Sequence, residues 1–402
     1  MKPNPLIVGA GPVGLGAALF LHRAGISARI IDEAEKPSIY SKALAVNPRT
    51  LEILEQTGVT EKMLALGLPI RGGRFWQHEK VIGEMRFEKL LHKYRFMLAL
   101  SQATTERLLN EALEAAGGKV GRGTRLIGCA SGGDGVEARL ERCRDGTSET
   151  VQCPWLFAAD GAHSTVRHSL GINFDGSSFV APWHLADLPL KTSLESNFAH
   201  VFLHDAGFVF LLRVIDDASS HSRNPAVWRV ISNRRELLAK IPMAEIAGAP
   251  VWESDFHISH RINERLQAGN VYFAGDAAHI HSPMGARGMN LGLEDAWVFG
   301  ELARRGQMNR YETLRKPVDQ LVVNRVERLS RMVRADSGIA RLARSLVVYS
   351  LMKFPPVYRR VVTVFTGLDH RLEPPLEQSS GSRSPEGEHD LVHGKPSHAH
   401  SS

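Results

Sequence analysis

The sequence LIVGAGPVGLGAALFLHRAGISARIIDEAE, residues 6–35, carries the clearest structural signal in this chain. Residues 6–8 predict a short apolar strand, and residues 13–24 carry the apolar spacing of an α-helix. Residues 27–31 predict a second strand, rich in β-branched side chains, that closes on Asp32. This order predicts a Rossmann-like βαβ unit at the start of an α/β fold.

The turn between the first strand and the helix, GAGPVG at residues 9–14, has the glycine spacing of a dinucleotide-binding loop. Glycines allow the tight turn and the close approach of a pyrophosphate, while the helix N-terminus supplies N–H donors. Asp32 stands about 20 residues farther on, where a carboxylate binds a ribose hydroxyl. An acid there favours a ribose without 2′-phosphate, as in NAD or the adenosine half of FAD. A chance glycine turn is the alternative, but strand, helix and acid together favour dinucleotide binding.

The composition is that of a folded protein. Its 402 residues, 43% hydrophobic and 23% charged, exclude a wholly disordered chain or a fibrous repeat. The net charge of +6 suits an anionic small molecule as well as a nucleic acid, and decides nothing alone. Three cysteines without CxxC spacing make a poor disulfide framework, which favours a reduced, cytoplasmic compartment. Glycines interrupt the apolar stretch at residues 6–21, so we predict no targeting segment there.

The middle of the chain changes to a mostly β pattern. Turn signals at 132–135 and 145–146 separate alternating segments and predict an antiparallel meander. More strands follow in 180–260, and a buried-strand pattern returns at 270–275, followed by a helix. We predict a Rossmann-like domain, an inserted, mostly antiparallel β-sheet substrate domain, and a C-terminal helical segment. The predicted divisions are 1–175 and 266–305 for the two parts of the cofactor domain, 176–265 for the β-sheet domain, 306–372 for C-terminal helices, and 373–402 for a disordered tail.

The C-terminal segment 343–362 carries basic and apolar residues at helical spacing. Such a helix could lie on a membrane surface. The favoured interpretation is a helix that packs on the domain and is broken at Pro355-Pro356.

A second motif, ADGAHSTVR at residues 159–167, directly follows an apolar strand. Asp160 opens a turn, a hydroxyl at 164 or 165 caps the next helix, and Arg167 offers a cation one turn later. A plain strand–turn–helix with a solvated arginine explains this motif equally well by itself.

A third motif joins GDAAH at 275–279 to SPMGARGMN at 282–290. Asp276 can accept hydrogen bonds from ribityl or ribose hydroxyls, and the glycines leave the backbone bare where a flat ring lies close. The residues GMN at 288–290 open a helix, whose N–H groups suit the negative charge of a reduced flavin. So many glycines would be costly in a purely structural loop, so this motif favours a binding function.

With these motifs in this order, the sequence resembles the FAD-dependent aromatic hydroxylases of the para-hydroxybenzoate hydroxylase type, the class A flavoprotein monooxygenases. The resemblance covers roughly residues 5–370. It rests on GAGPVG at 9–14, ADGAHSTVR at 159–167 and AGDAAHIHSPMGARGMNLGLEDA at 274–296. SKALAVNPRTLEIL at 41–54 and LSQATTERLL at 100–109 are similar to the subgroup that acts on phenolic and polyketide-like substrates. Larger members carry a C-terminal thioredoxin-like domain, for which this chain is too short.

The resemblance implies FAD as the cofactor. The first motif and Asp32 would hold its ADP half, Gln102 would lie along it, and Asp160 would serve both FAD and the transient nicotinamide. Asp276 would bind the ribityl-pyrophosphate region, and residues 283–290 would line the isoalloxazine. The implied cofactor-binding residues are Gly9, Gly11, Pro12, Gly14, Asp32, Lys42, Gln102, Asp160, Gly275, Asp276, Pro283, Gly285, Gly288, Met289 and Asn290.

Two positions depart from the family pattern. Lys42 stands where an arginine is more common, which keeps the charge but loses the bidentate fork. Arg287 replaces a small residue, and its cation could tune the flavin, recognise an anionic substrate or point to solvent. The catalytic residue is not identified by the sequence, and Pro283 and Arg287 are the flavin-loop candidates.

The resemblance implies hydroxylation of a small hydrophobic aromatic substrate, with NADH or NADPH as transient reductant and O₂ as co-substrate, through a flavin C4a-hydroperoxide. A metal or a nucleic acid is not expected, and the chain would act as a monomer or homodimer. Epoxidation, Baeyer–Villiger-type oxygenation or reduction on the same scaffold stays open. A catalytically silent FAD-binding scaffold or redox sensor is the alternative of another class. The WxWxIP segment of halogenase relatives is absent.

The substrate side is less readable from the sequence. Chemistry alone makes four residues candidates for handling a phenol proton: His78, His184, His204 and Tyr94. Five aromatic residues could face a flat substrate: Phe202, Phe208, Phe210, Trp183 and Trp228. Alternation along the strands predicts that only part of this set does, and that the rest lies in the core.

Overall fold

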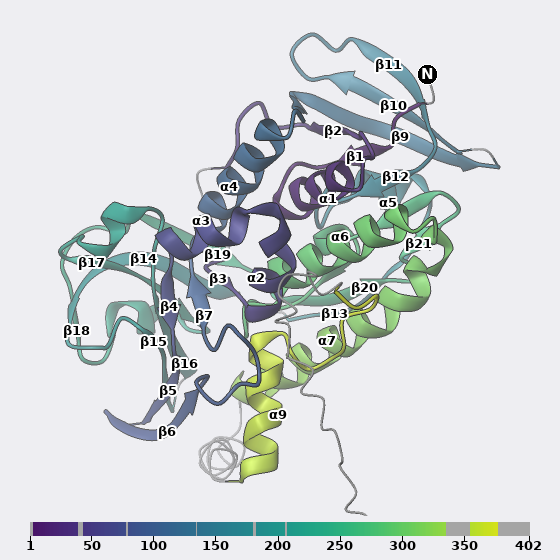
Figure 1. Ribbon diagram of the computed structural model, residues 1–402. Helices are drawn as coiled ribbons and strands as arrows, with labels where there is room; N and C mark the ends of the chain where they lie inside the picture. The colour runs from purple at the N-terminus through teal and green to yellow at the C-terminus, as the bar shows by residue number, and fades with distance from the viewer. Residues whose placement is uncertain are drawn as a thin grey trace, which may run out of the picture.

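The computed structural model describes residues 3–38, 43–77, 79–133, 135–179, 182–205, 207–334 and 354–376. Within them the chain forms a helix-covered, mostly parallel sheet, a large, mostly antiparallel sheet beside it, and C-terminal helices that contact both parts (Figure 1). This is the mixed α/β fold that the sequence predicts.

The parallel sheet has the strand order β21-β22-β12-β1-β2-β8, in which only the β21–β22 pair is antiparallel. Its strands are Leu6–Val8 (β1), Arg29–Asp32 (β2), Val120–Arg122 (β8), Leu156–Ala158 (β12), Gln267–Ala268 (β21) and Val271–Phe273 (β22). Helix α1, Pro12–Arg23, joins the first two strands, so the predicted βαβ unit is confirmed. β12 and β22 pair although the inserted sheet separates them in the sequence, so both ends of the insertion return to one domain.

Helix α1 packs against α6, Gly288–Arg304, with little between the two backbones. A Cβ on Gly16 would lie 2.8 Å from a Leu293 methyl, and one on Gly300 would lie 2.7 Å from the Phe20 Cβ. Glycines at these two positions therefore allow the close helix crossing. The neighbouring elements are α2 (Pro48–Leu54), α3 (Val59–Leu66), α4 (Gln102–Ala115), α5 (Thr165–Ser169), and the small sheet of β3 (Ala45–Val46), β7 (Met97–Ala99) and β4 (Leu68–Ile70).

The predicted meander is confirmed as a three-stranded antiparallel sheet. Its strands are β9 (Thr124–Gly132), β10 (Gly135–Arg142) and β11 (Ser148–Cys153). The glycine-rich turn joins β9 to β10, and the Asp145-Gly146 turn joins β10 to β11, as the sequence indicates.

The large sheet has the order β18-β14-β17-β16-β15-β5-β6, with β19 paired to β14. Its strands are β5 (Gly72–Gln77), β6 (Lys80–Arg86), β14 (Trp183–Thr192), β15 (Phe198–His204), β16 (Gly207–Arg213), β17 (Ala226–Ser232), β18 (Ala244–Ile246) and β19 (Trp252–Phe256). The sequence division places residues 72–86 with the cofactor domain, but the structure adds β5 and β6 to this sheet. β5 pairs with β15 in parallel, which local sequence patterns do not predict.

Each face of the large sheet has its own apolar core. Phe202 and Trp228 are buried in one cluster. Trp183 and Phe208 are buried in a second cluster, against which the half-buried Met284 of the third motif packs. The second face is therefore the one turned toward the cofactor domain, and the four aromatic side chains divide between the two faces.

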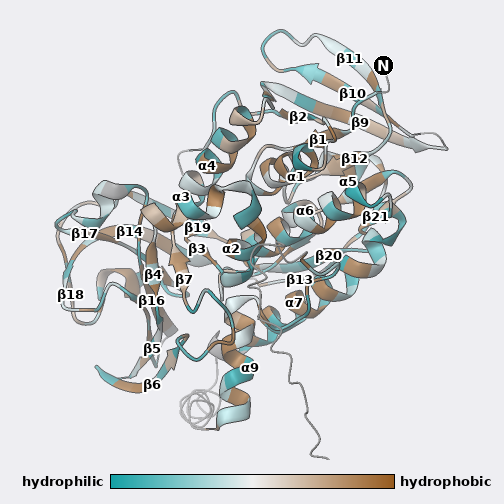
Figure 2. Ribbon diagram, in the orientation of Figure 1, coloured by the Kyte–Doolittle hydropathy of each residue, from teal (hydrophilic) through white to brown (hydrophobic). Residues whose placement is uncertain are grey.

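Another three-stranded sheet packs against helix α7, Tyr311–Arg334. Its strands are β13 (Phe174–Ser178), β20 (Ser259–Asn263) and β23 (His279–Ile280). Helix α9 spans Pro355–Thr366, so the Pro355-Pro356 pair starts a helix, where a missing N–H costs no hydrogen bond. Apolar and polar residues alternate around α7 and α9 (Figure 2). None of the described helices is long and apolar enough to cross a membrane.

Parts of two predicted C-terminal segments lie outside the described residues. These are residues 343–353 of the amphipathic segment and residues 377–402 of the tail. At the start of the predicted tail, Leu376 is partly buried against the main core.

Candidate functional site

The first motif forms the turn between β1 and α1, at the carboxyl end of β1. Gly9 has a φ of +98°, and a Cβ there would overlap the carbonyl oxygen of Ala159. A Cβ on Gly14 would overlap the carbonyl oxygen of Gly9, so the protein itself requires glycine at both positions. A Cβ on Gly11, by contrast, would meet no described atom within 4 Å. This space adjoins the N-terminus of α1, whose first N–H groups lack intrahelical partners and suit a pyrophosphate.

Asp32 ends β2 beside this turn. Its carboxylate accepts hydrogen bonds from the N–H of Ala10 at 2.6 Å and from that of Ala34 at 2.8 Å, which fastens the turn to β2. Gln102, the first residue of α4, donates to Glu106 at 2.8 Å. Burial raises the pKa of Glu106, and the nearby Asp32 charge adds to the effect. Glu106 therefore lies close enough to Asp32 to feel its charge, and Gln102 is held beside both by its hydrogen bond to Glu106.

Asp160 follows β12 and is a second acid at this edge of the parallel sheet. One carboxylate oxygen accepts a hydrogen bond from the N–H of Val166 at 3.1 Å. The other is buried and has no hydrogen-bond partner in the part of the chain that the structure describes. Burial raises the pKa of this carboxyl. An unpartnered buried acceptor is costly, so Asp160 fits a site that a ligand with a hydrogen-bond donor completes.

Arg167 is buried, which corrects the interpretation of the second motif as a turn with a solvated arginine. Its guanidinium donates to the carbonyl oxygens of Ala162 at 2.7 Å and Ala277 at 3.3 Å, and lies 4.1 Å from the ring centre of Phe174. Arg167 thus joins the second motif to the third.

The third motif begins at the carboxyl end of β22. Gly275 has a φ of +54°, and its N–H donates to Asp295 Oδ2 at 3.1 Å. Asp276 follows with an exposed side chain. Helix α6 begins at Gly288, and no hydrogen bond from the Arg287 side chain caps its N-terminus among the described residues. The first N–H groups of α6 therefore suit a partial negative charge on a ligand.

Other residues of the third motif divide into those that fix the loop and those that border open space. The Asn290 side chain donates to the carbonyl oxygen of Ala45 and accepts from the N–H of Asn47, both at 2.9 Å. Asn290 therefore ties α6 to the segment before α2. Pro283 is exposed and Met289 is half-buried, so both offer surface that a flat ring could contact.

Arg287 is buried at 2% exposure, which corrects the expectation that its side chain could point to solvent. Its Nη1 lies 2.8 Å from Asp369 Oδ1 and also donates to the carbonyl oxygen of Val364. The cation is therefore compensated inside the protein by a residue that follows α9.

A buried charge cluster, which the sequence analysis missed, lies behind the third motif. Arg315 on α7 donates to three buried carboxylates at 2.5, 2.7 and 2.9 Å: those of Glu294, Asp295 and Asp319. His279 Nε2 lies 2.8 Å from Asp295 Oδ2. Burial lowers the pKa of His279, but Asp319 and Asp295 outweigh it and raise the pKa to about 9. His279, Asp295 and Asp319 place ligand atoms within 4.8 Å of one another, yet Arg315 already pairs with both carboxylates, which makes this a salt-bridge network.

This cluster predicts a pH-dependent effect of Asp319→Asn. Burial, followed by repulsion from Asp295, raises the pKa of Asp319 from 3.8 to about 7. A carboxyl whose pKa is higher in the folded protein loses stabilising free energy as pH rises through that window. We expect the variant to match the unsubstituted protein near pH 4, and to unfold with a free energy about 1–3 kcal/mol higher at pH 8. Urea unfolding at both pH values measures this, and parallel pH profiles would contradict it.

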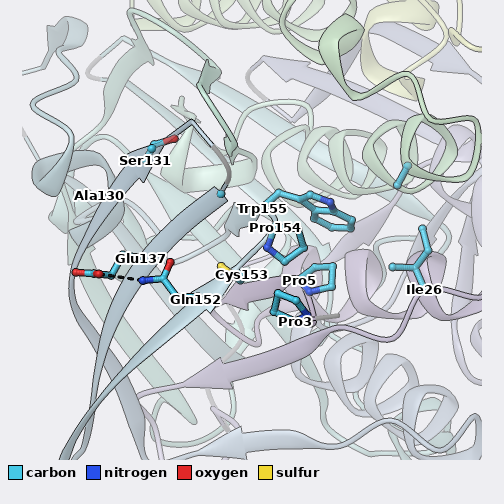
Figure 3. A pocket seen from close by; sticks show the side chains of 13 residues that line it. Pro3, Pro5, Ile26, Ala130, Ser131, Glu137, Gln152, Cys153, Pro154 and Trp155 are labelled. Carbon is cyan, nitrogen blue, oxygen red and sulfur yellow. Dashed lines mark hydrogen bonds between the residues drawn. The ribbon is translucent and has the colours of Figure 1, made fainter. Parts of the chain in front are cut away.

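The structure brings the three motifs together at the carboxyl ends of three neighbouring strands, β1, β12 and β22. Ligands of open α/β sheets bind at this end. Lys42 lies outside the described residues. The pocket in Figure 3 is elsewhere, at the amino ends of the same strands, where Pro5 precedes β1 and Trp155 precedes β12.

The candidates for proton handling are placed as follows. His184 Nδ1 lies 2.7 Å from Asp255 between β14 and β19. Burial raises the pKa of Tyr94 well above its usual range, so this phenol stays protonated at neutral pH. His204 ends β15, and His78 lies outside the described residues. Tyr94 is therefore suited to donate a hydrogen bond, and unsuited to act as a base at neutral pH.

The half-buried Phe210 packs both against the core of the cofactor domain and against the cluster on the facing side of the large sheet. Met284 packs against the same cluster from the third motif. Apolar and aromatic side chains therefore line the junction between the sheet and the loop.

Comparison with known proteins agrees with this site. A family model described as "FAD binding domain" matches residues 4–326. The 6-methylpretetramide 4-monooxygenase of Streptomyces rimosus is 33% identical over 94% of this chain and 72% of its own length. The pentachlorophenol 4-monooxygenase of Sphingobium chlorophenolicum is 30% identical over 78% of this chain and 62% of its own length.

Solved structures show the same architecture. The anhydrotetracycline hydroxylase OxyS from Streptomyces rimosus superposes with a TM-score of 0.74 at 27% identity, over 92% of this chain and 77% of its own. The p-nitrophenol 4-monooxygenase from Pseudomonas putida DLL-E4 superposes with a TM-score of 0.80 at 19% identity, over 92% of this chain and 99% of its own.

Proposed function

This chain belongs to the FAD-binding family of flavin-dependent aromatic monooxygenases, and we propose that it hydroxylates a phenolic or polyketide-like ring with NAD(P)H and O₂. The observation that carries the proposal is the convergence of the three motifs at one sheet edge, beside an apolar junction with the large sheet. The two relatives named as 4-monooxygenases of pentachlorophenol and of 6-methylpretetramide support this substrate class.

The residues present fit FAD. The space at Gly11 and the α1 N-terminus would hold the pyrophosphate, and Asp32 would bind a ribose hydroxyl. The orphaned oxygen of Asp160 and the exposed carboxylate of Asp276 would accept hydrogen bonds from the hydroxyl groups along the cofactor. The N-terminus of α6 would lie at the pyrimidine end of the ring, where a reduced flavin carries its charge.

Bound FAD supplies the redox chemistry, in which it accepts a hydride from the nicotinamide and activates O₂. The protein's contribution is to bind, orient and exclude water. Phe210 and Met284 would pack against a flat apolar substrate at the junction. Tyr94 is held protonated by burial and by its hydrogen bond to Glu55, so its hydroxyl already has an acceptor within the protein.

Oxygen incorporation tests this function. The protein, loaded with FAD, is incubated under ¹⁸O₂ with NADH or NADPH and a panel of phenols and polycyclic aromatic compounds. We expect one ¹⁸O atom in a hydroxylated product, formed in step with nicotinamide oxidation. An inserted ester oxygen, an epoxide or a reduced product would assign the chain to another flavin reaction. Nicotinamide oxidation that yields only hydrogen peroxide with every compound would contradict the proposal for this substrate class.

Asp276→Ala tests the placement of the cofactor's sugar chain. Loss of the carboxylate is expected to weaken FAD binding by about 10–100-fold, or about 1.4–2.8 kcal/mol, because its hydrogen bonds to hydroxyl groups are charge-assisted. Quenching of FAD fluorescence measures the dissociation constant. Asp145→Ala, which removes an exposed carboxylate from the β10–β11 turn, is the control. Equal affinities for FAD in the two variants would remove Asp276 from the site.

A further inference from the structure

The chain between α9 and residue 370 returns to the third motif. In Figure 1 the yellow end of the described chain runs back from α9 toward α7. Phe365 lies 3.5 Å from the position of a Cβ on Gly285, a residue whose φ of +79° forms the bend before α6. Gly367 lies so close to the Asn47 side chain that a Cβ would overlap it. Residues 364–370, named the C-terminal clasp here, therefore contact both segments that Asn290 joins.

Asp369 is the charged centre of the clasp. Its side chain is 3% exposed. One carboxylate oxygen lies 2.8 Å from Arg287 Nη1, and the other forms an ion pair with Arg325 of α7. Arg287 also donates to the carbonyl oxygen of Val364 in the clasp. The residue before α6 is thus held by two bonds to a segment more than 70 positions later in the chain.

His370 extends the clasp to two more helices. Its Nε2 lies 2.8 Å from Glu294 in α6, and its carbonyl oxygen accepts from Arg49 of α2 at 3.1 Å. Its Nδ1 lies 3.3 Å from Asp369, so the imidazole stands between two carboxylates. The clasp therefore joins α2, α6 and α7 at the loop where the flavin ring would bind.

We propose that Asp369 and His370 are positioning residues of the flavin site, which hold Arg287 and the first turn of α6 in the conformation that receives FAD. The inference rests on the proposed function. A buried guanidinium that loses its only described carboxylate must find another partner or move toward water. At Arg287 such a movement displaces the N–H groups at the start of α6, because Arg287 is the N-cap residue. The clasp thus acts on the cofactor through Arg287 and does not need to touch it.

Asp369→Asn is the first test. We expect the dissociation constant for FAD to rise at least tenfold, and Asp369→Glu to recover part of the loss. Asp255→Asn is the control, because Asp255 is an exposed carboxylate paired with His184 and Arg235 on the far side of the large sheet. The effect of Asp369→Asn on FAD affinity is also measured in an Arg287→Gln background. If Asp369 acts through Arg287, its substitution should weaken FAD binding less in that background. Additive effects in the double variant, or a folded Asp369→Asn protein with normal FAD affinity, would overturn the inference.

His370→Gln keeps the test decisive if the Asp369 variants do not fold. Burial lowers the pKa of His370, but Asp369 and Glu294 outweigh it and the opposing charge of Arg315, so the pKa is raised. The protonated imidazole therefore attracts the Asp369 and Glu294 carboxylates at low pH. This attraction is lost as pH rises through the raised pKa of His370. We expect the FAD affinity of the unsubstituted protein to fall as pH rises through the raised pKa of His370, and that of His370→Gln to stay level. Matching pH profiles would contradict the inference, whereas failure of the unsubstituted protein to bind FAD at any pH would instead contradict the proposed function.

Discussion

Gly11→Val is expected to weaken FAD binding by at least about 100-fold, or about 2.8 kcal/mol, while the apoprotein stays folded. The reason is the difference between Gly11 and the two other glycines of its motif. Side chains at positions 9 and 14 would overlap the backbone, whereas a Cβ at position 11 meets no described atom within 4 Å. The valine would therefore occupy only the space that the pyrophosphate needs.

Titration of the apoprotein with FAD, followed by fluorescence quenching, measures this effect, and urea unfolding of the apoprotein checks the fold. Gly132→Val is the matched control, because position 132 is equally open but lies at the β9–β10 turn, far from the motif. A Gly11→Val protein that binds FAD as tightly as the control would remove the pyrophosphate from this turn.

Arg315→Met is expected to lower the free energy of unfolding by about 3–5 kcal/mol, the largest stability effect predicted for this chain. Methionine fills much of the space of the arginine side chain but carries no charge. Glu294 and Asp295 therefore stay buried without their main cation. Removing the cation that the carboxylates share is costly, because the negative charges that remain stay buried and repel one another. Since Asp295 also accepts from the N–H of Gly275, the loss should reach the third motif and weaken FAD binding as well.

Arg331→Met on the same helix is the control. Arg331 pairs with Glu327 one turn away at 2.7 Å, but its side chain is 65% exposed, so the pair contributes less than about 1 kcal/mol. Chemical unfolding of the two variants should therefore separate them clearly. Equal losses would mean that the Arg315 network is no more important than a surface ion pair.

The sequence predicts the parts of this fold whose signals are local. The βαβ unit at residues 6–32 and the β9–β11 meander follow from strand periodicity and glycine turns, and both are confirmed. The membership of β5 in the large sheet could not be predicted, because its parallel partner β15 lies far along the chain. Side-chain alternation identifies a strand but does not choose its neighbour.

The same distinction applies to the site. The three motifs carry their own signals, and the structure brings them to one edge of the parallel sheet. The buried charged residues that hold these motifs in place carry almost no sequence signal. In a sequence, Arg315 and Asp369 look like ordinary surface residues. One signal was available: Glu294 and Asp295 stand together inside the apolar run LGLEDAWVFG, where a pair of acids needs a buried cation. Its partner could not be named without the packing of α7 on α6.

The absorption spectrum of the purified protein, after loading with FAD, shows whether the chain is a nicotinamide-dependent flavoprotein. It is recorded again after NADH or NADPH is added without oxygen, with and without a phenol from the panel. We expect the two visible bands of a bound flavin, loss of the long-wavelength band on reduction, and faster loss when a substrate is present. A protein that stays colourless after loading with FAD would contradict the assignment of the cofactor. A bound flavin that neither nicotinamide reduces, with or without a phenol, would contradict its assignment as a nicotinamide-dependent monooxygenase.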